Sequence, residues 1–335
     1  LMIGAWKLAP ALAMGNSVVL KPAETASLSL LRLAEICSEC GLPDGVLNVV
    51  TGPGAVTGAA LSEHMDVDVL VFTGSGATGR RLLEASARSN LKRCYLELGG
   101  KSPNVVFADA PDLEQAAKVS AAGIFRNAGQ VCVAGSRLLV EDSIHDEFVE
   151  ALSRHAAAMK VGNPLDLTTN IGAVNNLTQL EGNLNFVTKA IEEGAEVALG
   201  GSRIMEDTGG YFMEPTVLKG VKPEHNVAQN EVFGPVLAVT PFTSDAEAVA
   251  IANSTKFGLA AGVWTRDINR AYRMGRGIQA GRVWTNCYHA YPAHAAFGGY
   301  KKSGIGRETH KMMMDHYQQT KNLLVSYDTN PLGFF

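Results

Sequence analysis

The spacing of apolar and polar positions along the chain predicts an α/β fold. Short aliphatic runs bounded by Gly, Pro, Asn or Asp are typical of buried strands, while apolar residues three and four positions apart predict amphipathic helices. In the first hundred residues the predicted strands are 16–22, 46–50, 67–72 and 94–98. The predicted helices are 27–40, 57–64 and 77–89. Because strands and helices alternate, we expect a parallel sheet covered by helices.

A second α/β unit follows the first. Its predicted helices are 112–125, 145–159, 179–193, 246–253 and 268–277. Its predicted strands are 137–140, 217–218, 236–239, 262–264 and 282–284. The chain then carries a last β-like run at residues 322–327, which has no predicted strand beside it. We expect this run to pair with a neighbouring subunit, because an unpaired strand leaves its backbone groups without partners.

The composition is typical of a soluble enzyme. The length of 335 residues suggests two domains, and 46% hydrophobic against 19% charged residues allows a sizeable core. The formal net charge of −4 argues against a nucleic-acid surface. No run reaches the ~18 apolar residues of a membrane span. We therefore expect neither nucleic acid nor membrane as a partner.

The five cysteines are scattered and odd in number. This pattern fits a reducing compartment rather than a disulfide framework, so we expect a cytoplasmic protein. No Cys/His cluster has the spacing of metal ligands, and we expect no metal. Four of the thiols are expected to be inert, namely Cys37, Cys40, Cys94 and Cys287.

The fifth cysteine, Cys132, has a different setting. It ends the loop Phe125-Arg126-Asn127-Ala128-Gly129-Gln130-Val131-Cys132, between a predicted helix and a β-rich run. Upstream, the motif Glu97-Leu98-Gly99-Gly100-Lys101 places an acid at the end of an apolar strand. A thiol on a tight loop, with a carboxylate from another strand end, is typical of covalent catalysis with a general base.

A glycine-rich turn precedes this acid. The stretch Gly74-Ser75-Gly76-Ala77-Thr78-Gly79 matches G-x-G-x-x-G, follows a predicted strand and opens a predicted helix. Helix N-terminal amides and the helix dipole favour a pyrophosphate at such a turn. In these sites an acid about 20 residues further on holds the ribose. Glu97 lies 18 residues after Gly79 (97 − 79), so the spacing alone allows it as ribose ligand or as base.

Several segments together resemble the NAD(P)-dependent aldehyde dehydrogenase superfamily, in order and at near-family spacing. They are Leu20-Lys21-Pro22-Ala23-Glu24, Phe72-Thr73-Gly74-Ser75, Glu97-Leu98-Gly99-Gly100-Lys101, Gly129-Gln130-Val131-Cys132 and Glu231-Val232-Phe233-Gly234-Pro235. The tail Phe297-Gly298-Gly299-Tyr300-Lys301-Lys302-Ser303-Gly304-Ile305-Gly306-Arg307-Glu308 is also similar to that family. The resemblance covers essentially the whole chain.

The resemblance implies a role for each reactive group. The Cys132 thiolate would attack an aldehyde to give a thiohemiacetal, and hydride loss would leave a thioester. Water activated by Glu97 would hydrolyse the thioester and release a carboxylate, which makes Glu97 the base. A thiol with the ordinary pKa of ~8.5 needs a base or a favourable field for this reaction at neutral pH. Glu308 and Lys7 match positions near the proton exit path.

The resemblance also implies NAD as the cofactor. Lys21 and Glu24 match the positions that hold the adenine ribose. A carboxylate there accepts hydrogen bonds from both ribose hydroxyls and repels a 2′-phosphate, so Glu24 favours NAD over NADP. The other expected cofactor residues are Gly74, Ser75, Gly79, Gln179, Glu231 and Phe233.

The resemblance also implies a substrate tunnel, and the positions that match its walls are Trp6, Arg126, Tyr291 and Phe297. An Arg at position 126 would attract a polar or anionic substrate or simply face solvent at the mouth. Residues 286–294 and 331–335 resemble the acetaldehyde/chloroacetaldehyde branch, while residues 123–125 are closer to enzymes acting on amino-aldehydes. These two signals disagree, and the expected substrate is limited to the class of aliphatic aldehydes.

The implied fold is a Rossmann-type cofactor domain, an α/β catalytic domain and a terminal oligomerisation strand. The expected boundaries are 1–99 for the cofactor domain, 100–302 for the catalytic domain and 303–335 for a return to the cofactor domain and the tail. The expected assembly is a homodimer or homotetramer. Because the chain opens as if within a helix, we expect it to be part of a longer protein, and the family resemblance implies an oxyanion-binding Asn in the preceding segment.

Two alternatives stay open. One is a CoA-acylating relative, in which another nucleophile takes the acyl group. Glu97 as a water activator argues against it. The other is a non-catalytic NAD-binding protein that keeps the fold, and the presence of both Cys132 and Glu97 argues against this.

Overall fold

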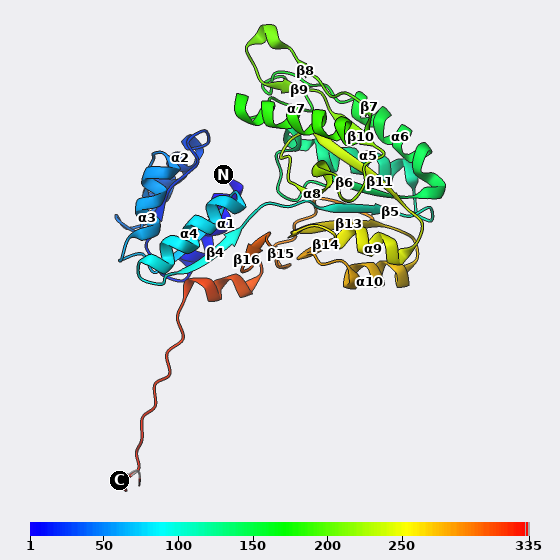
Figure 1. Cartoon of the computed structure of the whole chain (residues 1–335). Coiled ribbons are helices and arrows are strands. Elements are labelled where there is room, and N and C mark those ends of the chain that lie inside the picture. The colour runs from blue at the N-terminus through cyan, green and yellow to red at the C-terminus, as the bar shows by residue number, and fades with distance from the viewer. Residues whose placement is uncertain (332, 334–335) are drawn as a thin grey trace.

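The computed structural model describes residues 1–331 and 333. Figure 1 shows a smaller body, formed by the N-terminal part of the chain, beside a larger one built on an extended sheet. The late, orange-to-red part of the chain passes between the two bodies and continues under the smaller one (Figure 1). The elements of the smaller body are α1 (Met2–Ala13), β1 (Val18–Leu20), α2 (Leu28–Glu39), β2 (Leu47–Val49), α3 (Ala59–Glu63), β3 (Val69–Thr73), α4 (Gly76–Arg88) and β4 (Arg93–Glu97).

The smaller body contains the predicted alternation of strands and helices. Its strands form two parallel pairs, β1 with β2 and β3 with β4. A short strand from much later in the chain, β16 (Gly304–Ile305), pairs antiparallel with β4. Parallel strands place their carboxyl ends at one edge, so the segments after β3 and β4 lie side by side.

The larger body holds the second predicted unit. Its helices are α5 (Leu113–Phe125), α6 (His145–Ala157), α7 (Leu177–Glu192), α8 (Asn226–Gln229), α9 (Asp245–Asn253) and α10 (Ile268–Gly277). Its main strands are β5 (Pro103–Val106), β6 (Arg137–Glu141), β7 (Glu196–Leu199), β10 (Thr216–Lys219), β11 (Val236–Phe242), β13 (Ala260–Trp264) and β14 (Arg282–Thr285). Two short antiparallel pairs are β8 (Arg203–Ile204) with β9 (Phe212–Met213), and β12 (Phe257–Gly258) with β15 (Tyr300–Lys301).

The seven main strands make one sheet in the order β14-β13-β5-β6-β11-β10-β7. All neighbouring pairs are parallel except β7, which runs antiparallel to β10. The central strand β5 is absent from the sequence prediction. It has only four residues and begins with Pro103, which a strand tolerates at its first position. Its burial on both faces comes from neighbours far away in the sequence.

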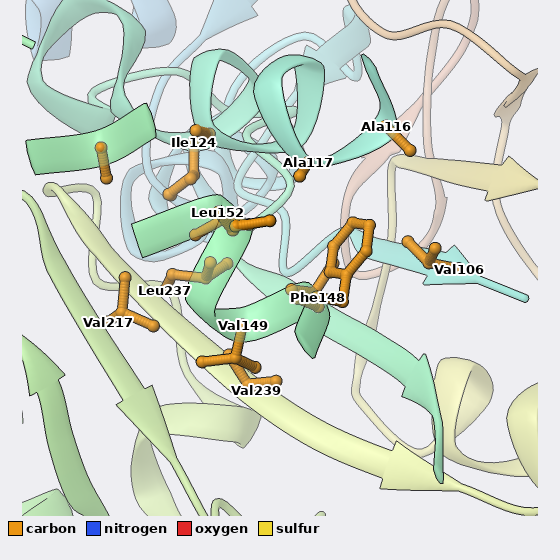
Figure 2. Packing of buried hydrophobic residues seen from close by; sticks show 14 of the residues in the cluster. Val106, Ala116, Ala117, Ile124, Phe148, Val149, Leu152, Val217, Leu237 and Val239 are labelled. Carbon is orange, nitrogen blue, oxygen red and sulfur yellow. The ribbon is translucent and has the colours of Figure 1, made fainter. Parts of the chain in front are cut away.

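Side chains alternate between two hydrophobic cores on the faces of this sheet. Leu138 and Val140 of β6 pack with α5 and α6 on one face. Leu139, between them, packs with α9 and α10 on the other face. Figure 2 shows the first core, in which Phe148 and Leu152 of α6 lie over the strands. Such two-sided burial explains the continuous apolar runs of these strands.

The predicted terminal strand is not formed. Residues 322–327 have no strand assignment, and Leu324 and Tyr327 are 87% and 93% exposed. A strand needs a partner edge for its backbone groups, and this segment extends away from both bodies (Figure 1). Pairing with another subunit and the three domain boundaries stay predictions. Of the end segment 331–335, Leu332, Phe334 and Phe335 lie outside the described residues. No helix in the described part is long and apolar enough to cross a bilayer.

The loop after α5 has a left-handed backbone at three successive residues. Asn127, Ala128 and Gly129 have φ of 55°, 54° and 70°. Gly129 is pressed against the segment before β11, since a Cβ there would lie 2.0 Å from the carbonyl oxygen of Gly234. Both the dihedral angle and the close approach therefore require glycine. This contact anchors the loop that carries Cys132.

We predict that Gly129→Ala lowers the free energy of unfolding by about 3 kcal/mol or more, because it adds left-handed strain to a backbone clash. The matched control is Gly275→Ala on α10, where an added Cβ meets nothing within 4 Å. That change should raise stability by about 0.5–1 kcal/mol through the unfolded state. Urea unfolding of both variants checks this, and equal effects would contradict the proposed anchor.

Candidate active site

A cavity of about 690 Å³ is lined by segments from both bodies. Most of the predicted site residues reach it from α1, from the ends of β3 and β4, from α7 and from three loops. They are Trp6, Gly74, Ser75, Glu97, Cys132, Gln179, Glu231, Phe233, Tyr291, Phe297 and Glu308. Five other predicted residues do not line it, namely Lys7, Lys21, Glu24, Gly79 and Arg126. Residues from distant parts of the sequence thus meet at one place.

Cys132 sits on a loop held close to the link between β4 and β5. A Cβ at Gly100 would lie 2.3 Å from the carbonyl oxygen of Cys132, so only glycine permits this approach. Burial raises the pKa of the Cys132 thiol to about 12, and the negative charges of Glu231 and Glu97 add to the shift. The sulfur therefore holds its proton at neutral pH until a base takes it.

Glu97 ends β4 and is 5% exposed. Its Oε2 atom has no hydrogen-bond partner among the described residues. Burial raises the pKa of Glu97, and the charge of Glu308 adds to this, while Lys7 and Arg307 oppose the shift. The resulting pKa is about 9. A cavity-lining carboxyl with an unpaired oxygen and a high pKa has the properties of a general base for water or thiol.

Lys7 and Glu308 form an ion pair next to Glu97. Both side chains are largely buried. Lys7 Nζ also donates to Thr73 Oγ1 at 2.7 Å, which ties α1 to the end of β3. Glu308 is held in turn by a pair of backbone hydrogen bonds with Phe297, from N to O at 2.6 and 2.7 Å. The pair fixes the distant tail segment beside the carboxyl of Glu97.

The turn between β3 and α4 presents a helix N-terminus to the cavity. Ser75 is the N-cap of α4, and its Oγ accepts a hydrogen bond from Thr78 N at 3.2 Å. A Cβ at Gly76 would meet nothing within 4 Å, so this face of the turn is open. Gly79 has a different place: its Cβ would lie 2.8 Å from Leu98 Cδ2, which lets α4 pack closely on β4. The open amides and helix dipole suit an anion such as a phosphate.

Lys21 and Glu24 lie beyond the carboxyl ends of β1 and β2. Glu24 Oε1 accepts from Gly54 N at 2.7 Å, while Oε2 lies 3.8 Å from Lys21 Nζ. Backbone hydrogen bonds, from its own amide and that of Gly54, lower the pKa of Glu24, and the charge of Lys21 adds to this. Glu24 is therefore ionised and its side chain is 55% exposed. It can accept further hydrogen bonds from a ligand.

Glu231 enters the cavity from the opposite body. Its Oε1 accepts from Gly100 N at 3.0 Å, and burial raises its pKa. Gln179 of α7 supports this segment by donating from Nε2 to Val232 O at 2.8 Å. Phe233 has a left-handed φ of 54° and is 40% exposed. A large apolar ring in that conformation needs the surrounding contacts to hold it.

One end of the cavity is aromatic. The Trp6 ring lies 5.4 Å from Phe297 and 6.3 Å from Tyr291, between ring centroids, in edge-on and tilted arrangements. These rings come from α1 and from the segment before β15. Arg126 is exposed and lies outside the cavity lining. Burial raises the pKa of Tyr291, and the positive charge of Arg126 opposes this rise.

The sequence prediction missed several cavity residues. Thr73 and Gln130 lie within the motifs that resemble the family, but the resemblance implies no role for them, and Thr178 precedes the predicted start of a helix. Thr73 accepts from Lys7, while Gln130 Oε1 accepts from Asn175 N at 2.9 Å. His289, which contacts the Tyr291 hydroxyl, carries no sequence signal that separates it from an ordinary loop histidine. Within the described residues no three metal-ligating side chains gather as an ion site.

Comparison with known proteins shows which family this chain resembles. The family model of the aldehyde dehydrogenase family matches residues 1–323. The chain is 54% identical to an acetaldehyde dehydrogenase of Pseudomonas aeruginosa and 53% identical to aldehyde dehydrogenase B of Escherichia coli, covering 100% of this chain and 67% and 66% of theirs.

A solved structure is also similar to this chain in fold. An indole-3-acetaldehyde dehydrogenase complexed with NAD+ superimposes with a TM-score of 0.95 at 47% identity, covering 96% of this chain and 65% of that one. The chain thus spans about two thirds of the length of these relatives. With a family match over residues 1–323 and more than half of its residues shared with these enzymes, the chain belongs to the aldehyde dehydrogenase family.

Proposed function

We propose that this protein oxidises small aliphatic aldehydes to carboxylates with NAD. The observation that carries the proposal is that Cys132 and Glu97 line one cavity and that Oε2 of Glu97 has no hydrogen-bond partner among the described residues. The same cavity contains a helix N-terminus at Ser75 and the Glu231 carboxylate. Family membership and the NAD-bound relative support the same reaction class.

The residues present fit a dinucleotide. The open amides at the start of α4 suit a pyrophosphate, and Ser75 lines the cavity beside them. The ionised Glu24 suits the two hydroxyls of a ribose, and Glu231 suits a second sugar. NAD, when bound, supplies the hydride acceptor for the oxidation. Gly74, Gln179 and Phe233 would complete its surroundings.

In the first step, Cys132 forms a bond from sulfur to the aldehyde carbon. The thiol proton must leave as this bond forms, because the pKa of Cys132 is raised to about 12. The carboxylates of Glu231 and Glu97 line the same cavity and act on the thiol through their charge, so either can receive this proton when it is deprotonated. Beyond Glu97, the Lys7–Glu308 pair can pass a proton onward. Loss of a hydride from the thiohemiacetal then leaves a thioester on sulfur.

In the second step, water attacks the thioester. Glu97 removes a proton from the water, the carbon–sulfur bond breaks, and the thiol of Cys132 is restored as the carboxylate leaves. The aromatic wall formed by Trp6, Tyr291 and Phe297 would hold the aldehyde tail. Arg126 would act only at the mouth, because it is exposed and outside the lining.

The assembly is proposed to be a homodimer or homotetramer. Support comes from the extended segment 322–327, where Leu323, Leu324 and Tyr327 are 81%, 87% and 93% exposed. Apolar side chains on an unpaired extended segment suit pairing with the sheet edge of a second copy. Size-exclusion chromatography with light scattering tests this, and a monomer would contradict it.

The reaction class is tested by NADH formation with acetaldehyde, with and without CoA. NADH formation that does not need CoA, with acetate as product, is the expected result. A requirement for CoA would favour an acyl-transferring enzyme, and NAD binding without turnover would favour a non-catalytic role. The assay uses the full-length protein.

We predict that Cys132→Ala abolishes dehydrogenase and ester-hydrolysis activity while NAD binding is kept. The reason is that no covalent intermediate can form without the sulfur. The control is Cys287→Ala, because Cys287 is an exposed thiol outside the cavity lining. It should retain normal rates. Near-normal turnover by the Cys132 variant would refute the assignment.

We predict that Glu97→Gln accumulates the acyl-enzyme and lowers the steady-state rate by about 10²–10⁴. Glu97 acts as a base only when deprotonated, so the wild-type hydrolysis rate should rise with pH and level off above about 9, where its pKa lies. The variant should lose that dependence. Mass spectrometry of Cys132 and a pH–rate profile check both parts. An unchanged rate with no adduct would argue against the role.

We predict that Glu24→Ser weakens use of NAD and improves use of NADP. Removing the carboxylate deletes hydrogen bonds to the ribose hydroxyls and the repulsion of a 2′-phosphate, a change of about 1–3 kcal/mol in the ratio of kcat/KM. Glu84→Ser on the exposed side of α4 is the matched control. If the wild type already uses NADP as well as NAD, Glu24 does not contact the ribose.

A further inference from the structure

The loop that carries Tyr291 is held in a strained conformation. Asn286 and His289 have left-handed φ of 55° and 58°. Trp284 Nε1 and Arg282 Nη1 both donate to Ala290 O, at 2.8 and 2.9 Å. Left-handed residues other than glycine persist where surrounding contacts hold them. The conformation of His289 is therefore imposed by its surroundings.

The His289 ring bridges α5 and the wall of the cavity. Its Nε2 lies 3.1 Å from the carbonyl oxygen of Gly123, and its Nδ1 lies 2.6 Å from the Tyr291 hydroxyl. A carbonyl only accepts, so Nε2 must carry a hydrogen and donate it. In the neutral ring Nδ1 is then a bare acceptor, and the Tyr291 hydroxyl must donate to it.

The ring is neutral at neutral pH. Burial lowers the pKa of His289, the carbonyl of Gly123 opposes this, and the positive charge of Arg126 lowers it further. The other titratable or charged groups facing this corner are Tyr288, whose ring lies 5.0 Å away, and Tyr291, with Arg282 and Cys132 acting on Tyr291. Among the described residues no carboxylate forms an ion pair with His289.

The direction of this hydrogen bond decides what Tyr291 offers to a ligand. The Tyr291 hydroxyl donates its single hydrogen to His289. Tyr291 lines the cavity, and it can therefore offer a ligand only the lone pairs of its oxygen. The neighbouring wall residues Trp6 and Phe297 present rings to the same space. A purely alkyl tail would leave the Tyr291 oxygen buried without a second partner, whereas a donor on the tail would satisfy it.

We propose that His289 is a positioning residue that holds the Tyr291 hydroxyl as a hydrogen-bond acceptor, so that the protein favours aliphatic aldehydes whose tail carries a hydroxyl or amine. The proposal rests on the proposed aldehyde oxidation and names its substrate class. A purely apolar tunnel would instead favour an alkyl tail over an equally long tail with a polar group.

The test compares three series of aldehydes of matched length, with a hydroxyl, a methoxy or a methyl group at the same tail position. At neutral pH the best-placed hydroxyl aldehyde should exceed its methyl analogue about tenfold in kcat/KM, the scale of one hydrogen bond. The methoxy analogue, which only accepts, should gain nothing. Tyr291→Phe should abolish the hydroxyl preference, measured as the ratio of kcat/KM for the hydroxyl and methyl aldehydes of the same length.

Variants of His289 separate positioning from mere packing. His289→Phe removes the acceptor, so the Tyr291 hydroxyl can turn its hydrogen into the cavity, and methoxy aldehydes should gain relative to methyl ones. His289→Asn keeps an acceptor oxygen near the place of Nδ1 and tolerates the left-handed backbone, so it should restore the wild-type order. The control is His294→Phe, an exposed histidine of the same loop, which should change nothing.

A pH readout tests the direction of the bond. Once the ring is protonated, below its ordinary pKa of about 6.5, Nδ1 donates and the Tyr291 hydroxyl must turn its hydrogen elsewhere. The methoxy-to-methyl ratio of kcat/KM should then rise in the wild type but stay constant in His289→Asn. The ratio cancels the effects of pH on Cys132 and Glu97.

Nitrogen-15 NMR of the His289 ring reports its tautomer without any turnover. A protonated Nε2 and a bare Nδ1 are expected, and the reverse tautomer would overturn the proposal. Oxidation of all three series without a hydroxyl preference would also overturn it and leave the proposed function intact. If no aldehyde is oxidised, the proposed function fails, and with it the substrate class named here.

Discussion

Two glycines between β4 and β5 create the close approach on which the cavity depends. A Cβ at Gly99 would lie 2.1 Å from Glu231 Oε2, and one at Gly100 would lie 2.3 Å from Cys132 O. The amide of Gly100 also donates to Glu231. Three segments of distant sequence therefore meet around a stretch of backbone that has no side chains. Any larger residue here would push the thiol loop and Glu231 away from Glu97.

This packing has an electrostatic cost for the groups that line the cavity. Removing Glu97 and Cys132 from water raises both pKa values, to about 9 and about 12, because burial penalises the charged forms. The charge of Glu308 adds to the rise in the pKa of Glu97, while Lys7 and Arg307 oppose it. Both groups therefore hold their protons more tightly than they would in water, and any bond change at the sulfur would require a proton transfer.

At the aromatic end of the cavity, a chain of hydrogen bonds sets the direction of the one polar group. Tyr291 is one of three rings on that wall, and its hydroxyl is its only polar atom there. Its direction follows from His289, and the direction of His289 follows from the carbonyl of Gly123 at the end of α5. A backbone group outside the lining therefore sets the polarity that a substrate tail meets.

Local pattern in the sequence determined most helices and strands, the phosphate-type turn and the two reactive motifs, because periodicity, glycine turns and helix starts are short-range signals. Tertiary structure decided the features that depend on residues far apart in the sequence. The strand β5 needed neighbours on both sides, and residues 322–327 formed no strand without a partner edge. The spacing after Gly79 allowed Glu97 two roles, and only the tertiary structure brings Glu97 to the cavity that Cys132 also lines. His289 acquired its partners only through contacts that join a helix end to a distant loop, since hydrogen-bond direction depends on three-dimensional neighbours.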